Sequence, residues 1–502
     1  MFSKVIGCSV FGIKGYIVDV EVDISNGLPM FNIVGLADTA ISESKERVRS
    51  AVKNSGYDLL PKRVVVNLSP ADLRKEGTGF DLPIALSLLC ANGYILEENL
   101  REYMVIGELS LDGEVKKVDG IINSVITAME NGIKGIIVPY DNKDEAAVIR
   151  GINIYPVKNL RQCIGFFNKE VKIENYMADL EIKEQNFTID FKEVKGQEKA
   201  KRGMEIAAAG GHNFMMIGSP GAGKSMLAKR IVTILPKMSE SEIIESTKIY
   251  SISGILNKKG AVVIERPFRA PHHTSSDVAI IGGGRFPKPG EISLAHNGVL
   301  FLDEFGEFSK GVIEVLRQPL EDKVVSVSRA LSTIEFPADF ILVAASNPCP
   351  CGYLYEDGNS VKSCVCTPFQ IQNYQKKISG PILDRMDMYI EIKKIPEEKL
   401  FKYEEGEDSK TIRDRVEKAR ETQYKRYKVN KTNSSMTQGD IKEYCKLDDE
   451  SKELLKTAAK QLGLSGRGFD KIMKVARTIA DIENSEMIKQ EHLIEALGYR
   501  KI

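Results

Sequence analysis

One eight-residue stretch constrains what this chain can fold into more than any other. It fits the pattern G-x-x-x-x-G-K-[ST] and reads Gly218-Ser219-Pro220-Gly221-Ala222-Gly223-Lys224-Ser225. An apolar run at 214–217 precedes it, and a segment of helical character follows from 226. In that context the loop backbone can surround a phosphate, Lys224 can reach the β- and γ-phosphates, and Ser225 can bind Mg²⁺. The stretch therefore predicts an α/β fold with a site for ATP and Mg²⁺.

Two later apolar runs end in polar residues that suit the same site. The run at 299–302 is followed by Asp303 and Glu304, and the run at 340–345 leads to Asn347. Carboxyl ends of parallel strands meet at one edge of a sheet. We expect Asp303 to hold Mg²⁺ through water and Glu304 to polarise the water that attacks the γ-phosphate. Asn347 can orient that water, although an ordinary turn at the end of a strand also explains it.

The length and charge of the chain limit the number of domains and the kinds of partner that it can have. A chain of 502 residues has room for about three domains. Lys and Arg together number 70, as do Asp and Glu, so any nucleic-acid contact must come from a local patch that oligomerisation could repeat. No signal-peptide core is visible, and no apolar run approaches the roughly 20 residues of a membrane helix. We expect a cytoplasmic protein without a membrane partner.

The chain divides into four regions by composition and periodicity. Residues 1–165 form a self-contained α/β domain in which 16–24 alternate between apolar and acidic residues, typical of a half-buried strand. Residues 166–190 are polar and aperiodic, which predicts a linker. Residues 191–395 would be the ATPase core, and 396–502 a helical lid domain.

Four of the eight cysteines lie together in the loop 349–366. They form two C-x-C pairs separated by 12 residues: Cys349 with Cys351, and Cys364 with Cys366. Four thiolates at this spacing can surround a structural Zn²⁺ tetrahedrally, whereas four reduced thiols without metal are the alternative.

The amino-terminal region resembles the proteolytic domain of Lon proteases, which has an S5 domain 2-type fold. The similar stretches are 75–85, 107–120 and 136–139. That family hydrolyses peptides with a Ser–Lys dyad. In this chain Asp81 falls at the serine position and Ile122 at the lysine position, and neither side chain can do that chemistry. We therefore expect no protease activity. Asp81 could be a relic of the family pattern, a charge at a subunit contact or a solvated acid, and the solvated acid is the default expectation.

The second half of the chain resembles AAA+ ATPases, in which Lys224, Asp303-Glu304 and Asn347 occur in this order. Flanking stretches resemble the ComM/YifB family of magnesium-chelatase-like AAA+ proteins, at 269–274, 289–296, 316–321 and 379–385. The resemblance covers nearly the whole chain.

The resemblance implies a hexameric ring with ATP bound between neighbouring subunits. Arg385 matches the arginine that reaches the neighbour's γ-phosphate, although a surface salt bridge to Asp384 or Asp387 would also explain it. Arg467 lies where such proteins carry a second arginine, on a helical lid over the nucleotide, and Arg477 is a competing candidate.

The resemblance also implies a function: an ATP-driven branch-migration helicase that acts on branched or single-stranded DNA in recombination and natural transformation. Two basic insertions, at 266–288 and 323–329, could line the pore of the ring. His272 and His273, in the first insertion, could contact phosphate or be satisfied within their loop. Alternatives are a chaperone-like protein-remodelling ATPase and an ATP-regulated scaffold that does not translocate.

Overall fold

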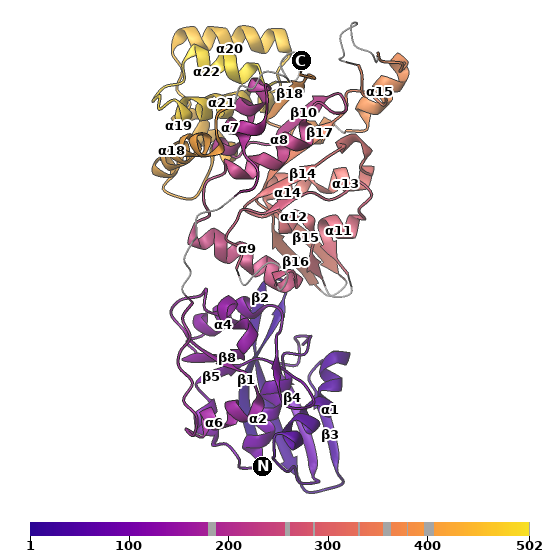
Figure 1. The fold of residues 1–502 in the computed structure, drawn as a ribbon, viewed down its shortest axis with the longest axis vertical. Coiled ribbons are helices and arrows are strands. Elements are labelled where there is room, and N and C mark those ends of the chain that lie inside the picture. Colours follow the sequence, from indigo (N-terminus) through magenta and orange to yellow (C-terminus); the bar gives the residue numbers. More distant parts are fainter. Residues whose placement is uncertain are drawn as a thin grey trace. The chain divides into compact units, whose positions relative to one another are not determined.

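A computed structural model describes residues 1–178, 187–256, 262–284, 287–329, 332–354, 363–378, 380–395 and 406–500, except for the side chains of Arg329 and Ser332. The chain forms two compact units, drawn in Figure 1. The N-terminal unit consists of residues 1–183 together with 240–264, and the C-terminal unit consists of 184–239 together with 265–502. Each unit is described by itself below.

A seven-stranded mixed sheet, in the order β3-β4-β2-β1-β5-β8-β9, is the centre of the N-terminal unit. The strands are β1 (Phe2–Phe11), β2 (Lys14–Ser25), β3 (Met30–Val34), β4 (Arg63–Ser69), β5 (Tyr103–Val105), β8 (Gly135–Pro139) and β9 (Asn153–Val157). A separate small hairpin joins β6 (Glu108–Leu109) and β7 (Val115–Lys116). The alternation predicted for 16–24 is observed in β2, where Val18, Val20 and Val22 are buried.

Helices pack with this sheet to form the hydrophobic core of the N-terminal unit. They are α1 (Thr39–Asn54), α2 (Asp81–Ala91), α3 (Glu97–Leu100), α4 (Ile121–Glu130), α5 (Lys143–Ala146) and α6 (Leu160–Phe167). Asp38 begins α1 by accepting a hydrogen bond from the Ile41 backbone at 2.8 Å, which satisfies one free N–H of the first turn. α2 packs on β1 and β2 and is buried along nearly its whole length.

The expectation that Asp81 is a solvated acid is wrong. Its side chain is fully buried at the start of α2. Arg47 of α1 donates from Nε to Asp81 at 2.7 Å, and the Leu109 backbone N–H donates at 3.2 Å. Burial raises the pKa of Asp81, while hydrogen bonds from Arg47 and Ser44 act in the opposite direction. The Asp81 carboxylate therefore links α1 to α2. The alignment of Asp81 with the Lon serine gives no indication of this contact.

The predicted boundaries also need a correction, because residues 240–264 belong to the N-terminal unit and not to a continuous core at 191–395. This segment contains α9 (Glu240–Ser253), which packs against α4. Ile244 and Val262 contact the buried cluster of α4 and β8, and Ser251 donates a hydrogen bond to the buried Glu145. Burial of apolar surface, not sequence continuity, decides to which core this segment belongs. Of the predicted linker, 179–186 lie outside the described residues.

The C-terminal unit contains a five-stranded parallel sheet in the order β11-β14-β17-β10-β18. The strands are β10 (Phe214–Gly218), β11 (Phe268–Arg269), β14 (Val299–Leu302), β17 (Ile341–Ser346) and β18 (Met388–Ile392). All residues of β14 and β17 are buried, as expected for strands that are covered on both faces. Two hairpins lie outside this sheet: β12 (Gly282–Gly283) with β13 (Lys288–Pro289), and β15 (Val324–Arg329) with β16 (Ser332–Pro337).

Helices connect and cover these strands. Within and around the sheet they are α7 (Glu198–Gly210), α8 (Lys224–Arg230), α11 (Asp277–Ile281), α12 (Glu291–Leu294), α13 (Lys310–Val315), α14 (Arg317–Asp322), α15 (Pro368–Lys376) and α16 (Gly380–Leu383). The helical end of the chain contains α18 (Ser409–Tyr427), α19 (Gln438–Tyr444), α20 (Asp449–Leu462), α21 (Gly466–Ile482) and α22 (Gln490–Leu497). Short 3₁₀ turns occur at Tyr140–Asn142, Phe191–Glu193, Ile231–Thr233, Phe305–Glu307 and Asn433–Ser435.

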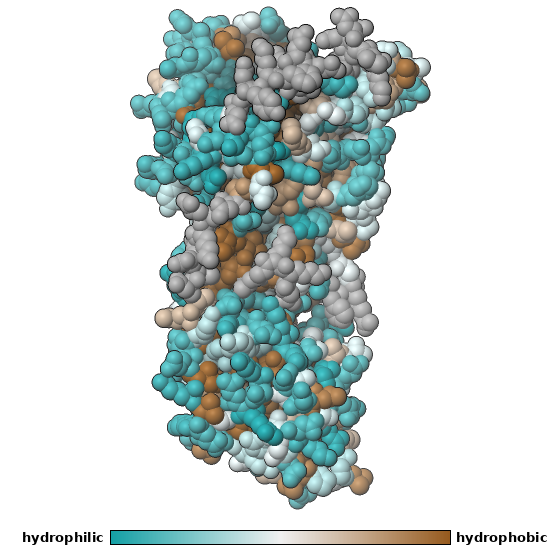
Figure 2. Space-filling model, viewed as in Figure 1, coloured by the Kyte–Doolittle hydropathy of each residue, from teal (hydrophilic) through white to brown (hydrophobic). Residues whose placement is uncertain are grey.

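The helical end shares its core with the sheet. α18 and α21 both pack on α7, beside which they are drawn in Figure 1, and one buried cluster extends from Phe214 of β10 to Ile472 of α21. Hydrophilic side chains cover most of the face of α18–α22 that Figure 2 shows. Within the described residues, no helix combines the length and the apolar character that crossing a membrane requires.

Candidate active site

The phosphate-binding motif forms the loop between β10 and α8, as its sequence predicts. Gly221 and Gly223 have φ angles of +79° and +96°, which favour glycine. At Gly218, a Cβ atom would lie 2.2 Å from the carbonyl oxygen of Ile392 on the neighbouring strand. The loop geometry therefore requires glycine at these positions.

Lys224 lies inside this loop. Its side chain is mostly buried, and Nζ donates to the carbonyl oxygens of Gly218 at 2.5 Å and Ser219 at 3.0 Å. Nζ also donates to Oδ1 of Asn347 at 3.1 Å, so the residue predicted at the end of β17 does lie at the site. Burial lowers the pKa of Lys224, whereas the charges of Asp303 and Glu304 oppose that shift. The loop therefore presents a partly desolvated cation, which suits a polyanionic ligand.

The two acids predicted after β14 also lie at this edge of the sheet. The Ser225 hydroxyl donates to Oδ2 of Asp303 at 2.5 Å, and the Glu304 backbone N–H donates to Oδ1 at 2.9 Å. A hydroxyl and a carboxylate in contact offer the oxygen donors that Mg²⁺ prefers, so these residues fit the predicted ion. Glu304 has a φ of +51°, uncommon for a residue with a Cβ, and its side chain is half exposed.

Sequence reasoning missed the partner of Glu304. Nδ1 of His273 lies 3.2 Å from Oε2 of Glu304, and the ring of His272 lies 4.2 Å from that of His273. His272 itself contacts the Thr274 hydroxyl at 2.8 Å. Both histidines are therefore satisfied by the protein. The available signal was topological: β11 and β14 are adjacent parallel strands, so the residues that follow them lie close together.

Arg385 and Arg467, the two arginines predicted to act at a nucleotide, lie away from the phosphate loop of their own chain. Arg385 precedes β18, whose first residue pairs with the first residue of β10, whereas the phosphate loop follows the last residue of β10. Arg385 and Arg467 line one pocket of about 420 Å³ at this amino-terminal edge of the sheet. Arg467, near the start of α21, shares this pocket with Arg385, so within one chain both arginines lie away from the phosphate loop; the role of Arg467 at a nucleotide stays a prediction.

Glu321, not Asp384 or Asp387, is the carboxylate that pairs with Arg385. The Arg385 guanidinium lowers the pKa of Glu321, and the charge of Arg467 adds to the shift. Arg385 Nη1 also donates to the Pro381 carbonyl oxygen at 2.6 Å, while its buried Nε has no hydrogen-bond partner among the described residues.

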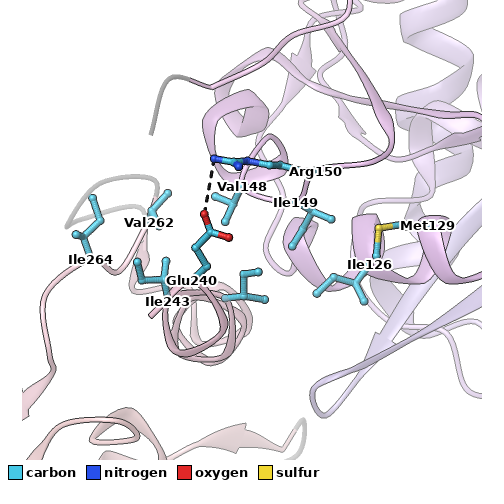
Figure 3. Close-up of a pocket in the computed structure, with 10 residues that line it drawn as sticks. Ile126, Met129, Val148, Ile149, Arg150, Glu240, Ile243, Val262 and Ile264 are labelled. Carbon is cyan, nitrogen blue, oxygen red and sulfur yellow. Dashed lines mark ion pairs between the residues drawn. The ribbon is translucent and has the colours of Figure 1, made fainter. Parts of the chain in front are cut away.

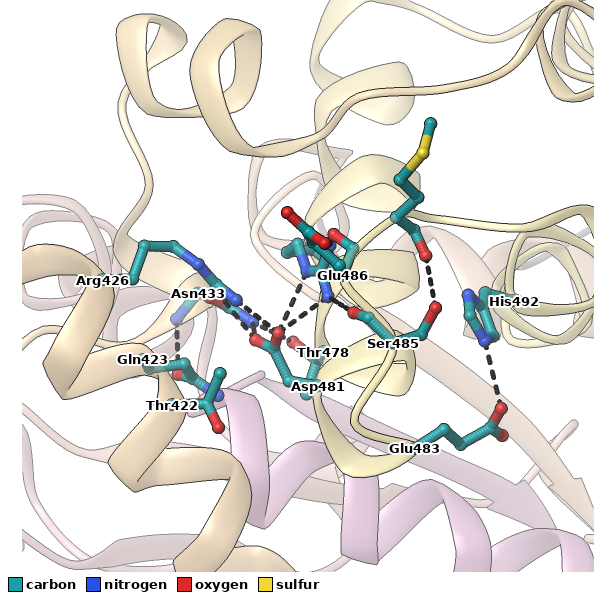
Figure 4. Close-up of polar contacts among 12 residues, drawn as sticks. Thr422, Gln423, Arg426, Asn433, Thr478, Asp481, Glu483, Ser485, Glu486 and His492 are labelled. Carbon is teal, nitrogen blue, oxygen red and sulfur yellow. Dashed lines mark hydrogen bonds and ion pairs between the residues drawn. The ribbon is translucent and has the colours of Figure 1, made fainter.

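Arg477, the alternative to Arg467 as the second arginine of the ATP site, is buried among the helices α18–α22. Its side chain is 2% exposed, and Nε donates to Asp481 at 3.0 Å while Nη1 donates to the Glu486 carbonyl oxygen at 2.7 Å. Figure 4 shows that Arg426 and Asn433 converge on the same Asp481 carboxylate. Arg477 therefore has a structural role.

The four clustered cysteines come together directly after Asn347. The sulfur of Cys349 lies 3.4 Å from that of Cys351 and 3.7 Å from that of Cys364, and Cys351 and Cys364 are also 3.7 Å apart. All four sulfur atoms, including that of Cys366, lie within 4.8 Å of one another. Burial raises the pKa of Cys349 to about 12. The cluster has the composition and compactness of a tetrahedral metal site.

The two basic insertions form hairpins, but their described cations are engaged within the protein. Arg269 makes two hydrogen bonds of 2.6 Å to Glu291, and Lys323 pairs with Asp339 at 2.8 Å. Arg266 donates to the carbonyl oxygens of Pro236 at 2.6 Å and Asn297 at 2.8 Å. These contacts support the local fold, and the lining of a channel by the two insertions stays a prediction. Arg285 and the side chain of Arg329 lie outside the described residues.

The N-terminal unit has a pocket of its own, of about 410 Å³ (Figure 3). Its walls are aliphatic, with residues such as Ile126, Val148 and Ile243, and Arg150 and Glu240 lie 3.8 Å apart beside them. At the positions matched to the Lon dyad, Asp81 and Ile122 are both fully buried and do not line this pocket.

A phosphate loop on the strand β10, an acidic pair after β14 and a polar residue after the intervening β17 define a P-loop ATPase of the AAA+ class. Family models agree: magnesium chelatase, subunit ChlI matches residues 190–400, its C-terminal model matches 406–500, and subunit ChlI of Mg-chelatase matches 20–142.

Full-length relatives identify the family more narrowly. The YifB protein of Escherichia coli is 43% identical over 98% of this chain and 96% of its own length. Competence protein ComM of Haemophilus influenzae is 42% identical over 97% of this chain and 95% of its own length. The chain belongs to the ComM/YifB family of magnesium-chelatase-like AAA+ proteins. Lon protease 2 of Bacillus subtilis is 26% identical over 32% of this chain and 33% of its own, which is weak support for a Lon-like domain.

Proposed function

We propose that this protein is an ATP-driven motor that assembles as a ring and migrates branched DNA. The observation that carries the proposal is the separation of the catalytic groups along β10. The phosphate loop follows its last residue, and Arg385 lies beside its first. Five residues of strand span roughly 16 Å, so Arg385 cannot reach a γ-phosphate bound to Lys224 of its own chain. A neighbouring copy would supply the arginine, and successive copies related head to tail form a ring when the rotation between them closes, which is the assembly that we propose.

The chemistry follows from the residues at the carboxyl edge of the sheet. Lys224 binds the β- and γ-phosphates, and Ser225 and Asp303 hold Mg²⁺, which neutralises phosphate charge when bound. Glu304 accepts a proton from the attacking water while Asn347 orients that water. Arg385 of the neighbour offsets charge that develops in the transition state.

DNA as the substrate is supported by the family. ComM, which is named as a competence protein, matches this chain over nearly its whole length. A branch-migration helicase of natural transformation is the activity that the sequence resemblance implies, and the name of this relative agrees with a role in competence. We assign DNA contact to the basic insertions 266–288 and 323–329, in which Lys323 is a substantially exposed cation.

The test is a junction-migration assay with a labelled four-way DNA junction, with and without ATP. The wild-type protein should dissociate the junction only with ATP, and branched DNA should stimulate its ATPase activity more than an unfolded protein does. The Glu304→Gln variant should bind ATP and form rings but leave the junction intact. Stimulation by unfolded protein alone would instead identify a protein-remodelling ATPase. Full migration by Glu304→Gln would refute the motor.

We also propose that the four cysteines bind one Zn²⁺. Zinc–thiolate bonds of about 2.3 Å place the sulfur atoms of a tetrahedral site about 3.8 Å apart. Two of the measured sulfur separations are 3.7 Å and the third is 3.4 Å. Metal analysis of the purified protein should find one zinc per chain; a folded, active protein without zinc would identify four reduced thiols.

A further inference from the structure

The four cysteines, together with Gly352, form a turn that we call the cysteine knuckle, and it rests against the phosphate loop. Gly352 has a φ of +85°, and a Cβ atom added there would lie 2.5 Å from Cδ and 2.7 Å from Cγ of Pro220. Van der Waals contact between carbon atoms begins near 3.5–4.0 Å. The Gly352 backbone therefore packs directly on the ring of Pro220, and Pro220 is a residue of the phosphate loop itself.

The knuckle also anchors Asn347 from the other side. Ser346 is held by the sheet, where it pairs with Ile217 of β10, and Cys349 is completely buried. Asn347 lies between these two fixed points, and its Oδ1 accepts the hydrogen bond from Lys224 at 3.1 Å. The position of the Asn347 side chain against Lys224 thus depends on where Cys349 is held.

A bound metal would decide how firmly the knuckle is held. Thiol–thiol contacts are weak, because S–H is a poor donor and sulfur a poor acceptor. Four metal–thiolate bonds fix all four sulfur atoms relative to one another, and the binding free energy of such a site contributes to folding. The ion would therefore fix the segment 349–352, which contacts Pro220 and follows Asn347, relative to the segment 364–366.

We infer that the zinc-loaded cysteine knuckle positions the phosphate loop and Asn347, so that nucleotide binding and hydrolysis require the metal. This inference rests on the zinc site and the ATPase activity proposed above. Its residues position the site and do not touch the reacting atoms. The knuckle therefore acts on ATP affinity as well as on turnover.

The experiment measures three quantities on the full chain: zinc content, the Kd of a fluorescent ATP analogue with Mg²⁺, and the rate of ATP hydrolysis. Cys364→Ser should lose zinc, bind the analogue more weakly and hydrolyse ATP about 10- to 100-fold more slowly. Gly352→Ala should keep its zinc but weaken analogue binding, because the added methyl group displaces Pro220. Cys90→Ser, in the N-terminal unit, is the matched control and should change neither zinc content nor Kd.

Chelation gives a second, reversible arm. Wild-type protein stripped of zinc should lose affinity for the analogue and regain it when Zn²⁺ is added back, with circular dichroism reporting that it stays folded. Wild-type Kd and turnover in folded, zinc-free protein would overturn the inference, and so would the absence of zinc from active wild-type protein. If zinc-containing wild-type protein binds the analogue but hydrolyses no ATP, the proposed ATPase activity is refuted. The change of Kd on removal of zinc would still show whether the cysteine knuckle positions the phosphate loop.

Discussion

In the proposed mechanism the Glu304 carboxylate accepts the proton of the attacking water, and its neighbour His273 offers a test of how that carboxylate is positioned. Replacing His273 by Ala removes the contact of 3.2 Å with Oε2 while leaving Lys224, Ser225 and Asp303 in place. We expect kcat for ATP hydrolysis to fall about 10-fold or more, because the half-exposed carboxylate loses its orientation. The Kd of the ATP analogue should stay unchanged. Steady-state ATPase and equilibrium binding assays measure the two effects.

His272→Ala is the matched control for that experiment. His272 contacts Thr274 and lies against the ring of His273, and among the described residues it makes no hydrogen bond or ion pair with the Glu304 carboxylate. Its effect on kcat should be smaller than that of His273→Ala. Equal losses in both variants would show that the loop as a whole, and not the His273–Glu304 contact, sets the rate.

Lys224→Ala should abolish nucleotide binding. The substitution removes a mostly buried ammonium group that contacts two loop carbonyl oxygens and Asn347, and no other described cation replaces it within the loop. Fluorescence titration with the ATP analogue measures the Kd. Lys229→Ala changes an exposed lysine of the same helix, α8, and should retain the wild-type Kd. Undiminished affinity of Lys224→Ala would contradict the assigned role.

The residues of the ATP site could be predicted because their signal is local. Loop glycines, Lys224 and the acids after an apolar run are constrained by sequence neighbours and by phosphate chemistry. The partners of these residues could not be predicted in the same way. His273 meets Glu304, and Glu321 meets Arg385, only because strands and helices distant in sequence pack side by side.

At the scale of elements, Asp387 fastens the start of β18 to the neighbouring helices and should make the C-terminal unit sensitive to acid. It accepts a hydrogen bond from the Asn213 backbone at 3.0 Å and pairs with Lys471 at 3.5 Å. Burial opposes its ionisation, but Lys471 and His212 together lower the pKa of Asp387 well below its ordinary value. A lowered folded-state pKa stabilises the fold above the ordinary pKa of the carboxyl group, and that stability is lost as the pH falls.

Asp387→Asn should therefore lower the free energy of unfolding at pH 7 by about 3 kcal/mol, since it leaves the largely buried Lys471 without its counter-charge. The variant should approach the wild type as the pH falls below about 4. Unfolding followed by circular dichroism between pH 3 and pH 7 tests this, as the chain has no tryptophan. A difference that is constant across this range would exclude the ion pair as its cause.

The secondary structure of a segment was easier to predict than the hydrophobic core into which that segment packs. The alternation of β2 and the phosphate loop of β10 identify their secondary structure from local pattern alone. α9 shows the limit: its sequence is helical, but nothing in it specifies that Ile244 and Ser251 will pack on residues of α4 and α5. Asp81 is a similar case, because the groups that stabilise its buried carboxylate, Arg47 and the Leu109 backbone N–H, lie 34 and 28 positions away in the sequence.

At the scale of the whole molecule, the proposed catalytic groups of one chain do not lie together. The phosphate loop and the Arg385–Arg467 pocket lie at opposite edges of one parallel sheet. The sequence resemblance implied both arginines but did not show that they line one pocket, because the direction in which α18–α22 pack depends on the core that they share with α7. Catalysis by these residues thus becomes a property of the assembly, which can be tested by mixing defective subunits.

Lys224→Ala and Arg385→Ala should each be inactive alone, the first because it does not bind ATP and the second because turnover falls about 10³-fold or more. In mixed assemblies, an Arg385→Ala subunit that binds ATP can receive Arg385 from a Lys224→Ala neighbour. Random mixing in equal amounts makes about one quarter of the interfaces complete, so about a quarter of the wild-type ATPase rate should return. Mixing Arg385→Ala with the double variant is the control, since it supplies no arginine and should restore nothing. Continued inactivity in proven mixed assemblies would mean that Arg385 acts within its own chain or only supports the fold through Glu321.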